Sequence, residues 1–212
     1  MIPDPIGEAV AWVRDGRLLA YPTETVWGLG ADAGADRALE RLWRWKGRDA
    51  SEPVAILVES LEDLDPLGFE VGRAAERLAA AFWPGPLTLV LNCGRRFAPG
   101  VARADGAVGV RCSAHPLAAA IARRLRAEGV GPITATSLNA SGEEPARTRG
   151  AAGAACGTGD EEPRMLDVDQ AESGGDAAST VVDATGRQPR VARWGALAAA
   201  RLEPVLREIS GS

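Results

Sequence analysis

Apolar residues recur every three to four positions in five stretches of the chain, which predicts amphipathic helices. Asp4 and Pro5 suit the start of the first helix, which runs up to Gly16, and Gly129 suits the end of the fourth. The five predicted helices cover about residues 5–15, 36–45, 71–82, 116–128 and 202–209.

Short apolar runs between turn residues predict strands. Residues 148–177 are rich in alanine, glycine and acids and contain only a short strand candidate at 165–168, so we expect a mobile surface segment and a candidate lid there. The clearest strands are 18–20, 54–58, 87–91, 107–111 and 133–136, followed by a hairpin that pairs 179–184 with 190–193 across Thr185-Gly186.

The alternation of strands with helices predicts an α/β fold with a twisted mixed sheet and flanking helices. We expect one domain over residues 1–196, with residues 197–212 as the C-terminal helical tail of that domain. No internal repeat is visible in the sequence.

Composition narrows the class of protein. Apolar and charged residues make up 46% and 25% of the chain, as in ordinary soluble globular proteins. No apolar run is long enough to span a membrane and the first residues do not form a signal peptide, so we expect a cytoplasmic protein without membrane contact. A net charge of −5 argues against stable binding of nucleic acid but is compatible with a local basic pocket. Cys93, Cys112 and Cys156 are too widely spaced to favour a disulfide framework or a zinc site.

Several common catalytic motifs find little support. No glycine-rich run precedes the only lysine, and no G-x-S-x-G elbow occurs. Gly28-Leu29-Gly30 with Ala33 fits the dinucleotide pattern, but we interpret it as a tight turn because it lies several residues after the clear strand. His115 precedes a proline, and we interpret it as a helix start rather than a catalytic base.

Lys46 is the only lysine among 24 lysine and arginine residues. Lysine is a compact point charge on a flexible stem, whereas arginine is a planar fork, so the two are not exchangeable where a small anion is gripped tightly. Lys46 and Arg48 both fall at the exit of a predicted helix. The helix pattern alone leaves two interpretations open: an anion-binding lysine, or a solvated lysine that the helix dipole favours.

Polar side chains gather at the ends of the predicted strands. Open α/β sheets bind ligands at the carboxyl ends of their strands, so we expect one cleft that is rich in cations and hydroxyls and suits phosphates and carboxylates. The small residues 137–142 could also present backbone N–H groups to an anion, although ordinary loops have the same composition. The residues at strand ends are Thr23, Thr25, Lys46, Arg48, Arg111, Ser137, Asn139, Ser179 and Arg193.

Six separated motifs follow one another along the chain. They are YPTETVWGLGADA, KGR followed by a proline, FWPGPLTLVL, VGVRCSAHP, PITATSLNASG and STVVDATGRQPRVARWG. In this order they resemble the YrdC/Sua5 family of threonylcarbamoyl-AMP synthases, over about residues 8–196. The resemblance is to the short, single-domain branch. It implies a YrdC-like open α/β fold with a central basic cleft, and it makes residues 1–196 the catalytic domain.

The resemblance implies an activity. The chain would condense L-threonine, bicarbonate and ATP into threonylcarbamoyl-adenylate and pyrophosphate, with Mg²⁺ on the ATP phosphates and no metal ligands of its own. The product would pass to a tRNA threonylcarbamoyl-transferase complex that makes N6-threonylcarbamoyladenosine at position 37 of tRNA. Such an adenylation depends on positioning and on cations near phosphate, which agrees with a site that has no obvious nucleophile.

The resemblance also implies roles for single residues. Lys46 and Arg48 would be catalytic, and Arg111 would bind the carboxylate of threonine. The expected ATP-binding residues are Lys46, Arg48, Ser137, Asn139 and Arg193, and the expected threonine-binding residues are Thr25, Arg111, Ala135 and Ser179.

The chain departs from the family pattern at four positions. Glu52 and Leu57 stand where the longer branch has asparagine and histidine. Leu138 and Trp194 replace an alanine and a proline, and we expect them to reshape the cleft wall and make the preference for threonine less strict. Two alternatives stay open: a YrdC-like adenylating enzyme that uses another amino acid or carbamate, as in hydrogenase maturation, and a non-catalytic RNA-binding module.

Overall fold

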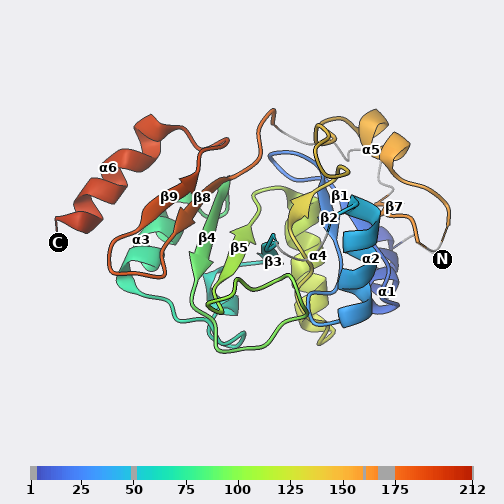
Figure 1. Ribbon diagram of the computed structural model, residues 1–212, viewed down its shortest axis with the longest axis horizontal. Coiled ribbons are helices and arrows are strands. Elements are labelled where there is room, and N and C mark those ends of the chain that lie inside the picture. Colours follow the sequence, from blue (N-terminus) through green and yellow to red (C-terminus); the bar gives the residue numbers. More distant parts are fainter. Residues whose placement is uncertain (1–3, 49–51, 160, 167–174, 212) are drawn as a thin grey trace.

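The computed structural model describes residues 4–48, 52–159, 161–166 and 175–211 (Figure 1). Helices flank two mixed sheets in this part of the chain, so the predicted α/β class with mixed strands and flanking helices is confirmed, and the strands divide between two sheets. The helices are α1 (Pro5–Arg14), α2 (Asp36–Lys46), α3 (Arg73–Phe82), α4 (Pro116–Ala127), α5 (Arg149–Ala155), α6 (Ala199–Ser210) and the 3-10 helix η1 (Leu61–Asp63).

The smaller sheet has the strand order β6-β2-β1-β7 and the larger sheet the order β3-β5-β4-β8-β9. Parallel pairs are β1/β7, β3/β5 and β4/β8, and the remaining neighbours run antiparallel. The strands are β1 (Leu19–Tyr21), β2 (Gly28–Gly30), β3 (Ile56–Val58), β4 (Leu87–Leu91), β5 (Val108–Cys112), β6 (Thr136–Ser137), β7 (Arg164–Met165), β8 (Thr180–Asp183) and β9 (Arg190–Arg193).

Residues 133–135 join the two sheets. The Thr134 N–H donates to the Ala31 carbonyl at 2.9 Å, next to the smaller sheet, and the Ala135 N–H donates to the Ala55 carbonyl at 2.6 Å, next to β3 of the larger sheet. The predicted strand 133–136 is therefore shortened to β6, because its first residues share their hydrogen bonds between the sheets.

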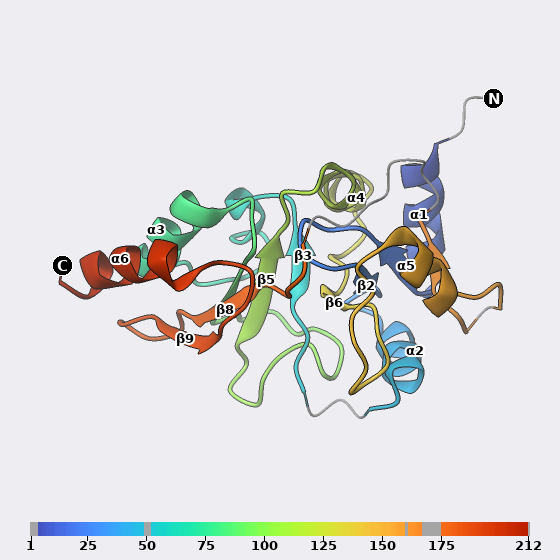
Figure 2. The same ribbon diagram turned by 90° about the horizontal axis from the view of Figure 1, so that it is seen from above.

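The helices lie at both ends and along the faces of this double sheet. In Figures 1 and 2, α3 and α6 lie together beside the β8-β9 hairpin, whereas α1, α2 and α5 lie beside the smaller sheet. α4 packs against α1 and β3 between these groups. Leu202 on α6 is fully buried, so the last helix is packed onto the core. No helix in the described ranges is both long and apolar enough to cross a membrane.

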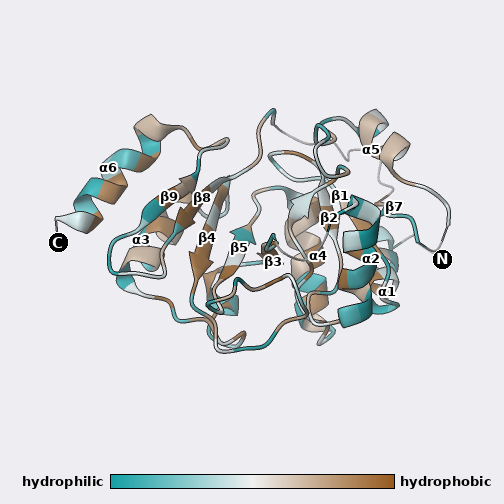
Figure 3. Ribbon diagram, viewed as in Figure 1, coloured by the Kyte–Doolittle hydropathy of each residue, from teal (hydrophilic) through white to brown (hydrophobic). Residues whose placement is uncertain are grey.

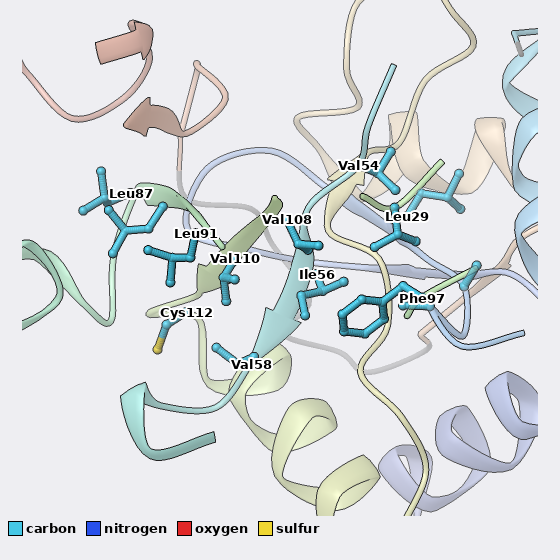
Figure 4. Close-up of a cluster of buried hydrophobic side chains, with 14 of the residues drawn as sticks. Leu29, Val54, Ile56, Val58, Leu87, Leu91, Phe97, Val108, Val110 and Cys112 are labelled. Carbon is cyan, nitrogen blue, oxygen red and sulfur yellow. The ribbon is translucent and has the colours of Figure 1, made fainter. Parts of the chain in front are cut away.

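The main core extends from the larger sheet and its covering elements to the smaller sheet and helix α2. Figure 3 shows β4 and β8 in the hydrophobic colour, and Figure 4 shows side chains of β3, β4 and β5 converging with Phe97. Val108, Val110 and Cys112 of β5 enter this core. Since side chains alternate along a strand, Arg111 points to the opposite face.

Gly28 and Gly30 form strand β2 and not the tight turn expected from the sequence. A Cβ atom on Gly28 would lie 2.7 Å from the ring of Tyr21, and one on Gly30 would lie 2.8 Å from Ile133. The glycines therefore allow close packing across the strands.

The short sequence patterns predicted some of the smaller elements and missed others. His115 Nδ1 accepts a hydrogen bond from the Leu117 N–H at 3.2 Å, which confirms His115 as the start of α4. Helix α5 was not predicted, because its sequence RGAAGAA contains two glycines and no apolar stripe. Of the candidate strand 165–168, Met165 lies in β7, and residues 167 and 168 are outside the described part.

Candidate functional site

A cavity of about 640 Å³ opens where the two sheets meet. Its wall combines the β1-β2 connection, the end of α2, residues 135–142, and residues of β4, β5, β8 and β9. The structure brings together in this wall every site residue expected from the sequence: Thr25, Lys46, Arg48, Arg111, Ala135, Ser137, Asn139, Ser179 and Arg193.

Lys46 ends helix α2 and is only 2% exposed. Gly47 closes the helix in the left-handed conformation at φ 66°, which turns the chain away and leaves the lysine side chain at the cavity. The Lys46 ammonium donates to the Ser137 carbonyl at 2.7 Å and to the Asn139 carbonyl at 2.9 Å. The interpretation as a solvated lysine is therefore wrong. Burial, and then the nearby charge of Arg48, lower the pKa of Lys46 to about 8, although Glu52 opposes this shift.

Arg48 lies beside Lys46 at the same edge of the cavity. Its guanidinium pairs with Glu52 at 2.6 Å and stacks over the Trp43 ring at 5.2 Å. The Glu52 side chain is 72% exposed, so a competing anion can replace it at little cost. Arg48 is thus held in place while its charge stays accessible.

Two hydrogen bonds made by side chains fix the turn after β6. The Ser137 hydroxyl donates to Asn139 Oδ1 at 2.5 Å, and the Asn139 amide donates to the Glu143 carbonyl at 2.8 Å. Leu138 between them points away from the cavity and is buried in the main core at 1% exposure. The expectation that Leu138 reshapes the cleft wall is therefore wrong.

Arg111 occupies another part of the wall, on the face of β5 opposite the core. Its side chain is 7% exposed and pairs with Glu24 at 2.5 Å. The same terminal nitrogen lies 3.4 Å from the Thr25 hydroxyl, which is 2.9 Å from the Thr23 hydroxyl. A guanidinium and two hydroxyls therefore face one region of the cavity.

Ser179 and Arg193 come from the β8-β9 side. The Ser179 hydroxyl is 2.8 Å from the Thr88 hydroxyl, and the Arg193 guanidinium donates to the Ser179 carbonyl at 3.0 Å. Gly195 follows at a point where a Cβ atom would lie 2.2 Å from the Ala178 carbonyl oxygen, so only glycine fits. Trp194 is 49% exposed and is not part of the cavity wall, so the expected effect on the wall is wrong for Trp194 too.

Thr88 and Arg103 are two polar residues of the wall that the sequence did not point to. Thr88 sits inside an apolar strand, where threonine is common for its β-branched shape alone, so it gave no functional signal. Arg103 lies in a loop and carries no motif. Its guanidinium pairs with Asp183 at 2.7 Å and with Asp105 at 2.5 Å, which holds it against the cavity.

Positive charge dominates the wall. Among the described residues that line it, Glu52 is the one carboxylate, whereas the cations are Lys46, Arg48, Arg103, Arg111 and Arg193. Cations converging on a cavity with hydroxyls and few carboxylates favour anionic ligands. No group of three or more acidic, histidine or cysteine side chains in the described part of the chain could hold a metal ion.

A family model for Sua5, YciO and YrdC, described as telomere recombination, matches residues 11–195. The chain belongs to the Sua5/YciO/YrdC family. The expected family is thereby confirmed, and it accounts for the order of the six motifs.

Members of the Sua5/YciO/YrdC family with established names resemble this chain. A threonylcarbamoyl-AMP synthase of Pyrococcus abyssi is 42% identical over 135 residues, which are 64% of this chain but 38% of the archaeal protein. A threonylcarbamoyl-AMP synthase of Chromohalobacter salexigens is 38% identical over 143 residues, which are 68% of this chain and 75% of that protein. The match therefore spans well under half of the Pyrococcus relative and most of the bacterial one.

The fold of this chain also matches a solved structure of a Sua5 protein. The crystal structure of P. abyssi Sua5 complexed with L-threonine matches with a TM-score of 0.83 and 33% identity. The match covers 97% of this chain and 58% of the Sua5 chain. Nearly all of this chain thus corresponds to a little over half of that Sua5 chain.

Proposed function

We propose that this chain is a threonylcarbamoyl-AMP synthase, which condenses L-threonine, bicarbonate and ATP into threonylcarbamoyl-adenylate and pyrophosphate. The observation that carries the proposal is the single cavity in which Lys46 and the Ser137 turn face Arg111 and Thr25. Its volume of about 640 Å³ falls within the range of roughly 300–1,000 Å³ that is usual for ligand sites.

The ATP phosphates would bind at the edge formed by α2 and the Ser137 turn, and Arg193 would reach the nucleotide from the β8-β9 side. Lys46 uses two of its three N–H donors on backbone carbonyls, so one donor can reach a phosphate oxygen. Arg48 has an exposed carboxylate partner that a phosphate can replace. Ser137, Asn139 and Arg193 complete the expected contacts with the nucleotide.

L-threonine would bind on the β5 side. The guanidinium of Arg111 suits the carboxylate of the amino acid, since arginine binds carboxylates through a planar fork of donors. Thr25, Ser179 and Ala135 line the same space, so polar and small apolar groups surround the amino-acid side chain. The resemblance to a Sua5 protein that binds L-threonine supports this choice of substrate.

The chemistry then consists of two steps. The amino group of threonine forms a C–N bond with the carbon of bicarbonate, and water leaves, which gives N-carboxy-threonine. An oxygen of this new carboxylate attacks the α-phosphorus of ATP, an O–P bond forms, and the bond to the β-phosphate breaks to release pyrophosphate. Cations in the wall stabilise the charge that moves onto the phosphate oxygens, so positioning and electrostatics supply the catalysis.

Mg²⁺ would arrive on the ATP phosphates. It prefers oxygen ligands and often takes only one or two protein oxygens besides phosphate and water. The hydroxyl of Ser141, the Asn139 amide and the Glu52 carboxylate lie in the wall and fit this demand. The ion would neutralise phosphate charge. The product would pass to a tRNA threonylcarbamoyl-transferase complex for formation of N6-threonylcarbamoyladenosine at position 37 of tRNA.

The test is pyrophosphate release by the purified protein with ATP, bicarbonate and a panel of amino acids, with mass spectrometry of the adenylate. We expect release that depends on bicarbonate and is fastest with threonine. Equal rates with serine or glycine would remove threonine as the preferred substrate. No release with any amino acid would overturn the synthase activity.

A further inference from the structure

Glu24 has both carboxylate oxygens occupied although it is not part of the cavity wall. Oε1 accepts a hydrogen bond from Arg111 Nη2 at 2.5 Å, and Oε2 accepts one from the Ser113 hydroxyl. The Ser113 oxygen itself accepts from the His115 N–H at 3.2 Å, at the start of α4. A chain of hydrogen bonds therefore runs from the α4 N-terminus through Glu24 to Arg111.

The position of these residues on one strand explains how Glu24 reaches both. Arg111 and Ser113 are two residues apart at the end of β5, so their side chains project from the same face. Glu24 comes from the β1-β2 connection, and its side chain reaches both residues on this face. The Glu24 side chain is 19% exposed and the Arg111 side chain 7%, so the ion pair is screened little by water.

The same contacts leave part of Arg111 without a partner. Nη2 faces Glu24 and Thr25, whereas Nε is buried and has no hydrogen-bond partner among the described residues. A buried donor without a partner is unfavourable, and a carboxylate in the adjacent cavity would satisfy it. Glu24 thus fixes one side of the guanidinium and leaves other donors for a ligand.

We propose that Glu24 is a positioning residue that holds the Arg111 guanidinium in the orientation needed for the carboxylate of the amino-acid substrate. This inference rests on the proposed function and adds to it a residue that does not touch the substrate. A free arginine side chain has many rotamers, and fixing it before the substrate arrives lowers the entropic cost of binding. Ser113 supports Glu24 in the same role from the other side.

The experiment measures pyrophosphate release and L-threonine binding by calorimetry for the full chain and the variants Glu24→Gln, Arg111→Gln and the double variant. We expect Glu24→Gln to raise the KM and Kd for threonine about 10- to 100-fold, with the KM for ATP unchanged and kcat changed by less than about threefold. The double variant should be no worse than Arg111→Gln, because both changes remove the same interaction. The proposal would be overturned if the effects of the two substitutions multiplied in the double variant, or if Glu24→Gln left the Kd for threonine unchanged.

Two further measurements separate positioning from other roles. L-threoninamide lacks the carboxylate and should therefore bind more weakly than L-threonine. Its Kd should be the same for wild type and Glu24→Gln. A large difference between the two Kd values would mean that Glu24 contacts another part of the substrate and would refute the inference.

Ser113→Ala removes one support of Glu24 and should raise the KM for threonine by about two- to tenfold, in the same direction as Glu24→Gln. This variant still tests the inference if Glu24→Gln does not fold.

The matched control is Glu203→Gln, which removes an exposed ion pair between Glu203 and Arg207 on α6. It should leave every kinetic constant unchanged. Wild-type pyrophosphate release tests the synthase activity itself, whereas the comparison among variants tests Glu24. An active wild-type protein with insensitive variants would therefore defeat this inference alone.

Discussion

The ammonium of Lys46 donates a hydrogen bond to the backbone carbonyl of Ser137 at 2.7 Å, across 91 positions of the sequence. A second bond to the Asn139 carbonyl makes this one side chain a link between the KGR and SLN motifs. A compact ammonium can approach two carbonyls of one turn, whereas the wider, planar guanidinium would need more room. The geometry gives a physical reason for a lysine here in a chain that otherwise uses arginine.

Replacing Lys46 by alanine should lower kcat/KM for adenylate formation about 10- to 1,000-fold, because one charge-assisted contact with phosphate is lost and the Ser137 turn loses its anchor. Pyrophosphate release at saturating threonine checks this. Arg44→Ala is the matched control, since Arg44 is on the same helix with its side chain 67% exposed and pairs with exposed Glu161. A Lys46→Ala protein as fast as wild type would contradict the assignment.

ATP binding should weaken as pH rises above about 8, the pKa to which burial lowers Lys46 in the free protein. Below that pH the ammonium is charged and attracts phosphate; above it the amine is neutral, so Kd should rise by up to tenfold per pH unit. Calorimetry with ATP between pH 7 and about 9.5 measures the effect. Lys46→Ala should lack this dependence, and a wild-type Kd that stays flat over the range would refute the prediction.

The same lowered pKa has a consequence for folding. Between about 8 and the ordinary value of 10.5 the unfolded chain still holds the Lys46 proton, whereas the folded protein has released it. The contribution of Lys46 to the free energy of unfolding therefore increases as pH rises through this window. The measurement is the free energy of unfolding in urea, as a function of pH, for wild type and Lys46→Ala. The difference between the two proteins should grow as pH rises through this window, and a difference that stays constant with pH would contradict the prediction.

Gly195→Ala should destabilise the fold by about 1–3 kcal/mol, as for an overpacked site. The new Cβ would lie 2.2 Å from the Ala178 carbonyl oxygen, and a backbone atom cannot move aside cheaply. The free energy of unfolding in urea measures the change. Gly186→Ala in the β8-β9 turn is the control, since no atom lies within 4 Å of its Cβ position. Equal stability of the two variants would show that the Gly195 turn can relax.

Leu138→Ala should cost about 2–5 kcal/mol of stability, as for a leucine lost from a core, and leave the order of preference among amino acids unchanged. The reason is that Leu138 packs into the main core and does not line the cavity. Urea unfolding and the amino-acid panel provide the two readouts. Trp194→Ala, at an exposed position, should affect stability little. A changed amino-acid preference in Leu138→Ala would place that side chain in substrate selection after all.

Local patterns predicted the site better than they predicted the sheets. The rule that polar residues at strand ends face a common cleft placed Arg111 and Ser137 in one cavity wall, because each ends or follows a strand that the apolar pattern made recognisable. The family motifs added Ala135, which has no polar group and gave no signal of its own.

What the sequence did not reveal depends on contacts between distant residues. The split into two sheets arises where residues 133–135 share their hydrogen bonds between Ala31 and Ala55, and no local signal encodes that choice. Gly28 packs against the ring of Tyr21 in the neighbouring strand, and this contact explains the glycine where the local G-x-G pattern does not. The pairing of Arg111 with Glu24 joins residues 87 positions apart, so only the fold shows that this acid occupies an arginine of the site.

The backbone link formed by residues 133–135 has a thermodynamic consequence for ligands. The two walls of the cavity cannot drift apart without breaking the hydrogen bonds that tie this link to one sheet or the other. The site is therefore preorganised: most of the conformational entropy of bringing its parts together is lost when the chain folds, and little is left to be lost when substrates bind.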